Sequence, residues 1–166
     1  MRALRQHALV ATAAMALVCL AVGRAHAVTI TTTGVFQNTV GGTNINTSAV
    51  SNSQKPGGWG AGTTFLNWGN PAYSNDVPDD QSGYAYTPVT NLNIGTPANG
   101  AQFVIGDFFH RNNPIDGGGG IDKTELKINV TINGGVPNPV TQQLLFNLDH
   151  FETPNYPFGS CAAGGN

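Results

Sequence analysis

Two polar side chains, His110 and Asn112, have the types and the spacing to bind a ligand or a metal ion. Residues two apart on a β-strand point to the same face, so the imidazole and the amide could converge on one bound group. Zinc needs about three protein ligands, and only His150 and scattered acids could complete that set. We favour the alternative, in which His110 and Asn112 close a strand and bond to the backbone around Pro114.

A second candidate site is an acidic segment that contains Asp76, Asp79 and Asp80. Carboxylates clustered on a loop supply the hard oxygen ligands that calcium prefers, so calcium is the cofactor that they could hold. Asp116 and Asp122 flank a glycine run and are candidate calcium ligands for the same reason. Neither segment has the spacing of a calcium-binding loop, and solvated turn residues are the simpler interpretation.

Aromatic side chains would suit a third chemistry, the stacking of rings on sugars. The platform of a carbohydrate-binding module could be formed by Trp59, Trp68, Tyr73, Tyr84 and Tyr86. The alternative assigns Trp68 and part of the tyrosine set to the core, because large aromatic residues bury the most area. In that case Trp59 is the best-placed candidate for an exposed ring.

Catalytic combinations are sparse. Asp149 and His150 are sequence neighbours on an expected strand, so they face opposite sides, which is poor geometry for a base and its orienting group. Asp107 and Glu152 could pair as in a glycosidase, but nothing in the sequence places their carboxyl groups at a suitable separation. The motifs of serine hydrolases and zinc proteases are absent. We therefore predict no enzymatic activity.

The segments around these candidates favour β-strands. Residues 125–132 alternate polar and apolar side chains, which predicts a half-buried strand with one wet face. Five further segments are rich in β-branched or aromatic residues, namely 28–33, 63–68, 84–87, 102–110 and 140–151. Gly34 is expected to end the first of these strands.

Glycine- and proline-rich turns separate these segments, and no window has helical periodicity. The sequence therefore predicts an all-β fold, a two-sheet β-sandwich of jelly-roll or immunoglobulin-like (Ig-like) type.

The first 27 residues have the layout of a secretory signal peptide. Two arginines lie within the first five residues, an apolar run covers residues 8–22, and Ala25-His26-Ala27 is the small-x-small pattern of a cleavage site. The apolar run is shorter than the ~20 residues of a transmembrane helix. We expect export through the Sec pathway, no membrane span in the mature chain, and one domain over residues 28–166.

Charge and cysteine content narrow the partners. The formal net charge is −2, and removal of residues 1–27 leaves four basic against nine acidic residues, a charge of −5. An acidic surface argues against nucleic acid as a partner. Cys161 is then the remaining cysteine, and we expect either a free thiol or a bond to a cysteine outside this sequence.

Three segments resemble one group of bacterial proteins. Residues 64–71, followed by Gln81-Ser82-Gly83, resemble a W-G-x-P … Q-S-G pattern. Residues 103–115 are similar to F-x-[LI]-G-x-F-T-H-x-N-x-P-I, with Phe109 in place of the usual Thr, and residues 146–155 resemble F-x-x-x-x-E-T-x-N. These patterns are signatures of the choice-of-anchor K domain and the related THxN family of PEP-CTERM proteins.

The resemblance implies an exported β-sandwich with no established enzymatic activity, often tethered by a C-terminal sorting signal. Similar proteins continue beyond a cysteine at the position of Cys161 to a second cysteine, a further strand and an anchor, whereas this sequence stops at Asn166. We therefore expect either a released protein or a chain truncated at its C-terminus. Truncation would leave an open sheet edge through which the protein could self-associate.

Together these points predict a secreted or cell-surface bacterial protein with a structural or adhesive role in the extracellular matrix and no catalysis. The expected partners are exopolysaccharide or other surface proteins. The alternative is a carbohydrate-binding module that uses exposed aromatic residues, and a hydrolase is the third class considered.

Overall fold

The computed structural model describes residues 27–50, 55, 57–71, 81–96, 100–115, 119–134 and 137–151. The predicted signal peptide lies outside these residues except for its last position. Every regular element in the described part is a β-strand: β1 (Val28–Gly41), β2 (Thr64–Trp68), β3 (Ser82–Pro88), β4 (Leu92–Gly95), β5 (Gly106–Arg111), β6 (Ile121–Asn133) and β7 (Val140–Asp149). The predicted all-β class is confirmed. The described residues include no helix long and apolar enough to span a membrane.

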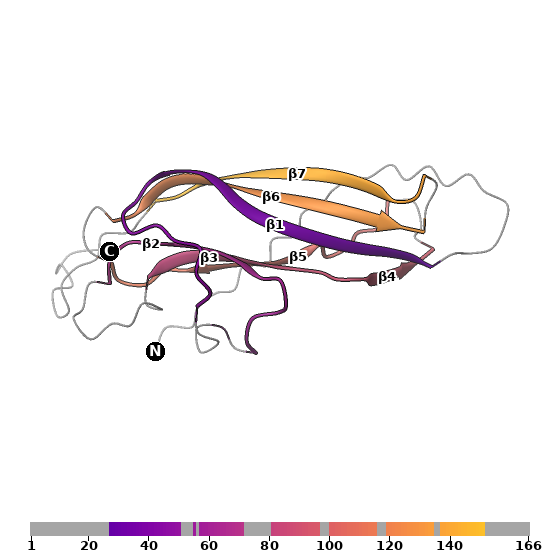
Figure 1. Ribbon diagram of the computed structural model, residues 1–166, viewed down its shortest axis with the longest axis horizontal. Coiled ribbons are helices and arrows are strands. Elements are labelled where there is room, and N and C mark those ends of the chain that lie inside the picture. Colours follow the sequence, from indigo (N-terminus) through magenta and orange to yellow (C-terminus); the bar gives the residue numbers. More distant parts are fainter. Residues whose placement is uncertain are drawn as a thin grey trace, which may run out of the picture.

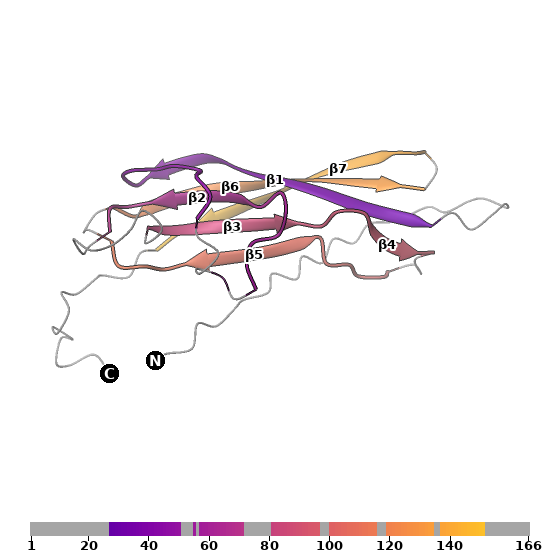
Figure 2. The ribbon, with the colours of Figure 1, turned by 60° about the horizontal axis from the view of Figure 1, so that its bottom comes forward.

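The strands form two antiparallel sheets that lie in two layers (Figure 1). One sheet has four strands in the order β4-β1-β6-β7, and the other has three in the order β2-β3-β5. Figure 2 shows the three strands of the smaller sheet side by side. The chain moves from the smaller sheet to the larger one between β3 and β4, where the backbone of Val89 bonds to Thr32 of β1.

The alternating pattern of β6 produces the core between the layers. Leu126, Ile128 and Val130 are almost wholly buried, at 1%, 3% and 0% exposure, while the residues between them face outward. Trp68 and Tyr86 of the smaller sheet pack against the same cluster from the opposite layer. Burial of this apolar surface is the main force that holds the two sheets together.

The expected end of the first strand at Gly34 is wrong, because β1 continues through it to Gly41. A Cβ atom at Gly34 would lie 2.7 Å from Cε1 of Tyr86, which packs over this position from the facing sheet. Because Gly34 has no side chain, it leaves space on the surface of β1 for the Tyr86 ring. A glycine inside a strand often marks such a close approach.

Two other strand predictions differ from the structure. The expected strand over residues 102–110 begins only at Gly106, because residues 101–105 precede β5 without strand pairing. The short strand β4 (Leu92–Gly95) was not predicted. Its residues alternate between half-buried and exposed, but the strand has only four of them, and its pairing with β1 includes a register shift.

Tyr86 gives the first testable consequence of this packing. Its hydroxyl donates to the carbonyl oxygen of Ile105 at 2.6 Å and lies 3.0 Å from Oγ1 of Thr32. Burial raises the pKa of Tyr86 above its ordinary value of 10.0; the Thr32 hydrogen bond opposes this rise, and the charge of Asp107 adds to it. The folded state thus prefers the protonated phenol more strongly than the unfolded state does.

The free energy of unfolding should therefore be unaffected by Tyr86 ionisation below about pH 10 and fall as the pH rises above it, because the unfolded chain ionises first. Denaturant unfolding at about pH 9 and pH 11 measures this fall. A Tyr86→Phe variant should be less stable at about pH 9, by about 1–2 kcal/mol, and should show a smaller alkaline loss. An equal alkaline loss in the variant would contradict the assignment.

Candidate functional site

Four ring side chains meet between the sheets at one end of the molecule. We call Trp68, Tyr84, His110 and His150 the histidine–aromatic cluster. Trp68 is fully buried, with its ring centroid 4.9 Å from Tyr84 and 4.8 Å from His150. The two histidine rings lie perpendicular to each other, with centroids 5.4 Å apart. The Tyr84 hydroxyl is 2.8 Å from Nδ1 of His150, a buried hydrogen bond that joins the two sheets.

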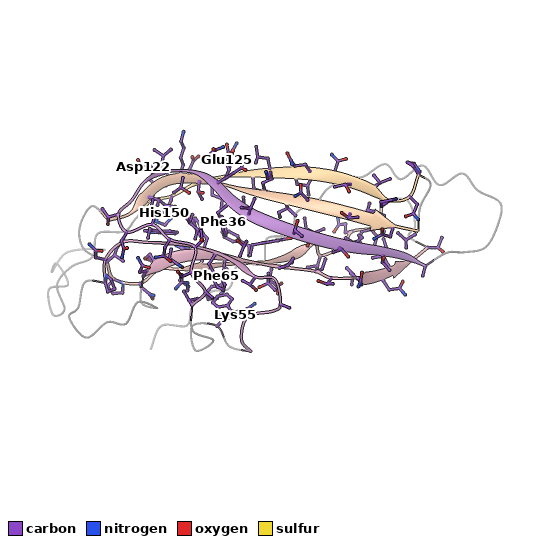
Figure 3. The ribbon with its side chains drawn as sticks, viewed as in Figure 1. Phe36, Lys55, Phe65, Asp122, Glu125 and His150 are labelled. Carbon is purple, nitrogen blue, oxygen red and sulfur yellow. The ribbon has the colours of Figure 1, made fainter. Side chains whose placement is uncertain are left out.

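Strand register places these rings. Tyr84 of β3 lies directly opposite His110 of β5, so both side chains project from the same face of the smaller sheet. Trp68 is the last residue of β2. His150 directly follows β7 on the other sheet, and its backbone N–H donates to the carbonyl oxygen of Asp122 at 2.9 Å. Figure 3 shows His150 and Phe36 in the space between the two layers.

A second group of polar side chains comes from β2, β5 and the segments that precede β2 and β3. We call Asn46, Asn67, Gln81 and Arg111 the amide network. Asn67 donates to Oδ1 of Asn46 at 2.9 Å, and Asn46 donates to Oε1 of Gln81 at 2.7 Å. The guanidinium of Arg111 donates to Oδ1 of Asn67. Asn67, Gln81 and Arg111 are buried, at 1%, 3% and 2% exposure.

The amide network ties three connecting segments to the end of the sandwich. Gln81 donates to the carbonyl oxygens of Gly69 at 2.6 Å and Asn44 at 3.0 Å. Asn46 and Asn67 also exchange backbone hydrogen bonds, of 3.1 Å and 2.8 Å, along the outer side of β2. Buried amides that are bonded in this way fix the path of a loop, because breaking them leaves polar groups without water.

A smaller pairing secures the segment after β5. The Ser82 hydroxyl donates to the carbonyl oxygen of Asn113 at 2.9 Å, and the backbone N–H of Asn113 lies 3.1 Å from the same hydroxyl oxygen. The side-chain amide of Asn113 donates to the carbonyl oxygen of Gln81 at 3.1 Å. Ser82 is fully buried, so these bonds replace the water that it has lost.

Two glycines in the signature segments are required by close approach. A Cβ atom at Gly69 would lie 2.6 Å from Cδ1 of Ile115, which is itself 1% exposed. A Cβ atom at Gly83 would lie 2.7 Å from the carbonyl oxygen of Leu66 and would overlap the guanidinium of Arg111. Neither position has room for a side chain.

The two residues of the first predicted ligand pair have different surroundings. His110 belongs to β5 and contacts the cluster, while its side chain also remains exposed to solvent. Asn112 lies one residue beyond the end of β5 and is exposed. The structure thus places His110 beside His150, a juxtaposition that the sequence did not predict.

Trp59 lies outside the main core, on the outer face of the smaller sheet. Its ring meets those of Phe65 and Phe109 edge to face, at 5.2 Å and 5.5 Å, and it is half-buried. The ammonium of Lys55 lies 5.4 Å from the centroid of the Trp59 ring and 4.0 Å from a carboxylate oxygen of Asp107. Figure 3 shows Lys55 and Phe65 together on this face.

Several predicted site residues lie outside the described part of the chain. These are Tyr73 of the aromatic platform, the calcium candidates Asp76, Asp79 and Asp80, and the thiol of Cys161. Among the described residues, no group of three or more histidine, cysteine, aspartate or glutamate side chains is arranged to hold a metal ion. The calcium prediction concerns other residues and stays a prediction.

The residues considered for hydrolysis are described only in part, so their pairing stays untested. Asp107 projects to the outer face beside Lys55, whereas His110 of the same strand contacts the cluster on the inner face. Glu152 lies outside the described residues.

Comparison with models of protein families gives no match for this chain, and comparison with curated proteins gives none either.

Sequence reasoning identified the segments of this site but assigned no role to Asn67, Gln81 or Arg111. The available signal was the presence of polar residues inside segments that are otherwise apolar. A buried polar side chain needs a partner, and Gln81 finds its side-chain partner Asn46 35 positions away in the chain.

Proposed function

We propose that this chain is an exported bacterial protein with a structural or adhesive role at the cell surface or in the extracellular matrix. We further propose that it is related to the choice-of-anchor K and THxN proteins, on the strength of the three signature segments. The observation that carries the structural role is the use of the signature residues. Trp68, Gln81 and Ser82 are buried, and the side chains of Gln81 and Ser82 are hydrogen-bonded within the protein.

The chemistry of these contacts supports a scaffold. A binding site needs polar groups that face a ligand, whereas the amides of Asn67 and Gln81 face other parts of the chain. Gly69 and Gly83 serve the same packing, because each leaves room for a side chain from the segment around β5. On this proposal the signature residues specify how loops are fixed to the sandwich.

We propose the finer fold to be a β-sandwich of jelly-roll or Ig-like type. The sheets of four and three strands have the strand numbers of a constant-type immunoglobulin sandwich, whereas the strand orders β4-β1-β6-β7 and β2-β3-β5 differ from its ABED and CFG orders. The proposed partners are exopolysaccharide or other surface proteins. A net charge of −5 after removal of residues 1–27 supports such partners over nucleic acid.

Export and location test the proposal together. The full chain is produced in a Gram-negative bacterium with antibody detection, and cytoplasmic, membrane, surface and matrix fractions are compared. We expect a protein that begins at Val28, recovered from the surface or matrix fraction, and its intact mass measures the cleavage site. Full-length protein confined to the cytoplasm would overturn the proposal.

The second candidate is a carbohydrate-binding module, and the position of Trp59 favours it. The ring lies on the outer face of a sheet and keeps part of its surface exposed. The ammonium of Lys55 covers one side of it, which would have to be shared with a sugar. Pull-down on insoluble polysaccharides, with a Trp59→Ala variant as the comparison, separates the two candidates. Binding that Trp59→Ala abolishes supports the module. Equal results for wild type and Trp59→Ala support the structural role.

A further inference from the structure

The strand β7 (Val140–Asp149) is an edge of the larger sheet. All ten of its residues pair with β6, from Val140 opposite Ile132 to Asp149 opposite Lys123, without a register shift. Among the described residues no strand pairs with its other side. The outward backbone N–H and C=O groups of β7 thus form a straight row that can pair with another strand.

The other sheet edges carry features that β7 lacks. The outer side of β2 is bonded to Asn46, and β4 has only four residues. The part of β1 beyond its pairing with β4 has register shifts between Gln37 and Gly41. The edge strand β5 has six residues and carries the charges of Asp107 and Arg111. Strand β7 contains no proline, lysine or arginine, and its one charge is at its last residue, Asp149. Natural edge strands are commonly protected by charges, prolines, bulges or short length, and β7 has none of these within its first nine residues.

The inner face of β7 is also incompletely covered. Leu144, Phe146 and Leu148 pack against the main core and remain partly buried. Leu144 and Phe146 lie opposite Ile128 and Leu126 of β6, which are almost wholly buried. An added strand beside β7 would cover the remaining apolar surface of these three residues.

We propose that a second copy of this chain binds at this edge, with the two β7 strands antiparallel about a two-fold axis through Phe146. Phe146 then faces Phe146 of the second copy, and Leu144 faces Leu148. On the outer face, Leu145 lies opposite Asn147, and Gln143 lies opposite Asp149. Every inner pair among these residues is apolar, and no like charges face each other, which are the features that stabilise cross-strand pairs.

This register is preferred over its neighbour. A two-fold axis through Leu145 would place Gln142 opposite Leu148 on the inner face and would pair an amide with an apolar side chain. Two-fold dimers are the commonest homo-oligomers, and pairing of two identical edges gives such a closed contact. A single strand pairing buries less than the ~1,600 Å² of a standard interface, so we expect a reversible dimer. The inference concerns self-association and does not depend on the proposed export or matrix role.

Sedimentation of the purified full chain, over protein concentrations from about 1 to 300 μM, tests whether a dimer forms. Two double variants then test the edge and the register. Leu145→Glu/Asn147→Lys places opposite charges across the proposed interface, and Leu145→Lys/Asn147→Lys places like charges there. Both change solvent-facing positions of β7, which lie opposite Lys127 and Glu125 of β6.

We expect the wild-type chain to dimerise, the opposite-charge variant to dimerise at least as tightly, and the like-charge variant to dissociate at a concentration at least about tenfold higher. Far-UV circular dichroism shows whether each variant is folded. If the like-charge variant does not fold, the opposite-charge variant still decides, because added salt should weaken its dimer relative to wild type.

A chain that stays monomeric over the whole concentration range would overturn the proposal. Equal dimerisation of both variants would overturn it too, because the dimer would then use another surface. Weakening by the opposite-charge pair would contradict the register, since an axis through Leu145 brings the two introduced glutamates together.

Discussion

Replacement of Gly83 by alanine is expected to lower the free energy of unfolding by about 3 kcal/mol or more. The added Cβ atom would lie 2.7 Å from the carbonyl oxygen of Leu66 and 2.9 Å from Oδ1 of Asn67. It would also overlap the guanidinium of Arg111, which donates to that same Oδ1 atom. The variant must therefore distort β2 or displace a buried cation from its hydrogen bond, and both changes are costly.

Gly57→Ala is the matched control. Gly57 has a φ of +85°, and a Cβ atom there meets nothing within 4 Å, so this variant bears only the cost of a left-handed backbone, about 1–2 kcal/mol. Chemical denaturation of both variants measures the difference. If Gly83→Ala is no more destabilising than Gly57→Ala, the close packing of Arg111 over Gly83 is wrong.

Trp68→Ala is the second large change, with an expected loss of about 3–5 kcal/mol. Trp68 has no exposed surface and contacts Tyr84, His110 and His150. Its removal leaves a cavity at the end of the sandwich and takes away the ring contacts that position both histidines. Thermal and denaturant unfolding measure the loss.

Trp59→Ala provides the comparison, because Trp59 is the other tryptophan of the chain and is half-buried on the outer face. Trp59→Ala should lower the free energy of unfolding by only about 1–2 kcal/mol. Fluorescence adds an independent readout, since each variant retains one tryptophan. The emission of Trp68 in Trp59→Ala should be blue-shifted relative to that of Trp59 in Trp68→Ala; equal emission and equal stability would place the two rings in similar environments and contradict the fold.

The fold class follows from local pattern to a large extent. The alternation of Leu126, Ile128 and Val130 predicts β6, because one face of this strand is buried against the facing sheet. Local pattern fails where a distant residue decides. Gly34 reads as a strand end, yet it lies inside β1 because the ring of Tyr86 needs its space.

The sequence indicated which segments form the candidate site, but it did not predict which side chains contact one another there. The sequence indicated His110 as a candidate ligand residue. Its neighbour His150 follows a strand of the opposite sheet, so the contact between them could not be predicted. Gln81 was recognised only as part of a motif, because its partners Asn44 and Asn46 lie more than thirty positions earlier. Contacts between residues so far apart in the sequence depend on how the sheets pack. Local composition and residue spacing do not predict that packing.

Native-state hydrogen exchange tests most directly whether the signature residues fix the loops to the sandwich. The backbone N–H groups of Asn46, Asn67 and Gly69 donate to Asn67, Asn46 and Thr43 at 3.1, 2.8 and 2.7 Å. If the loops and sheets form one cooperative unit, these amides should exchange nearly as slowly as that of Val130 in β6, within about tenfold. Exchange of these amides at the rate of an open loop, while Val130 stays protected, would contradict the structural role and leave these segments free to act on a ligand.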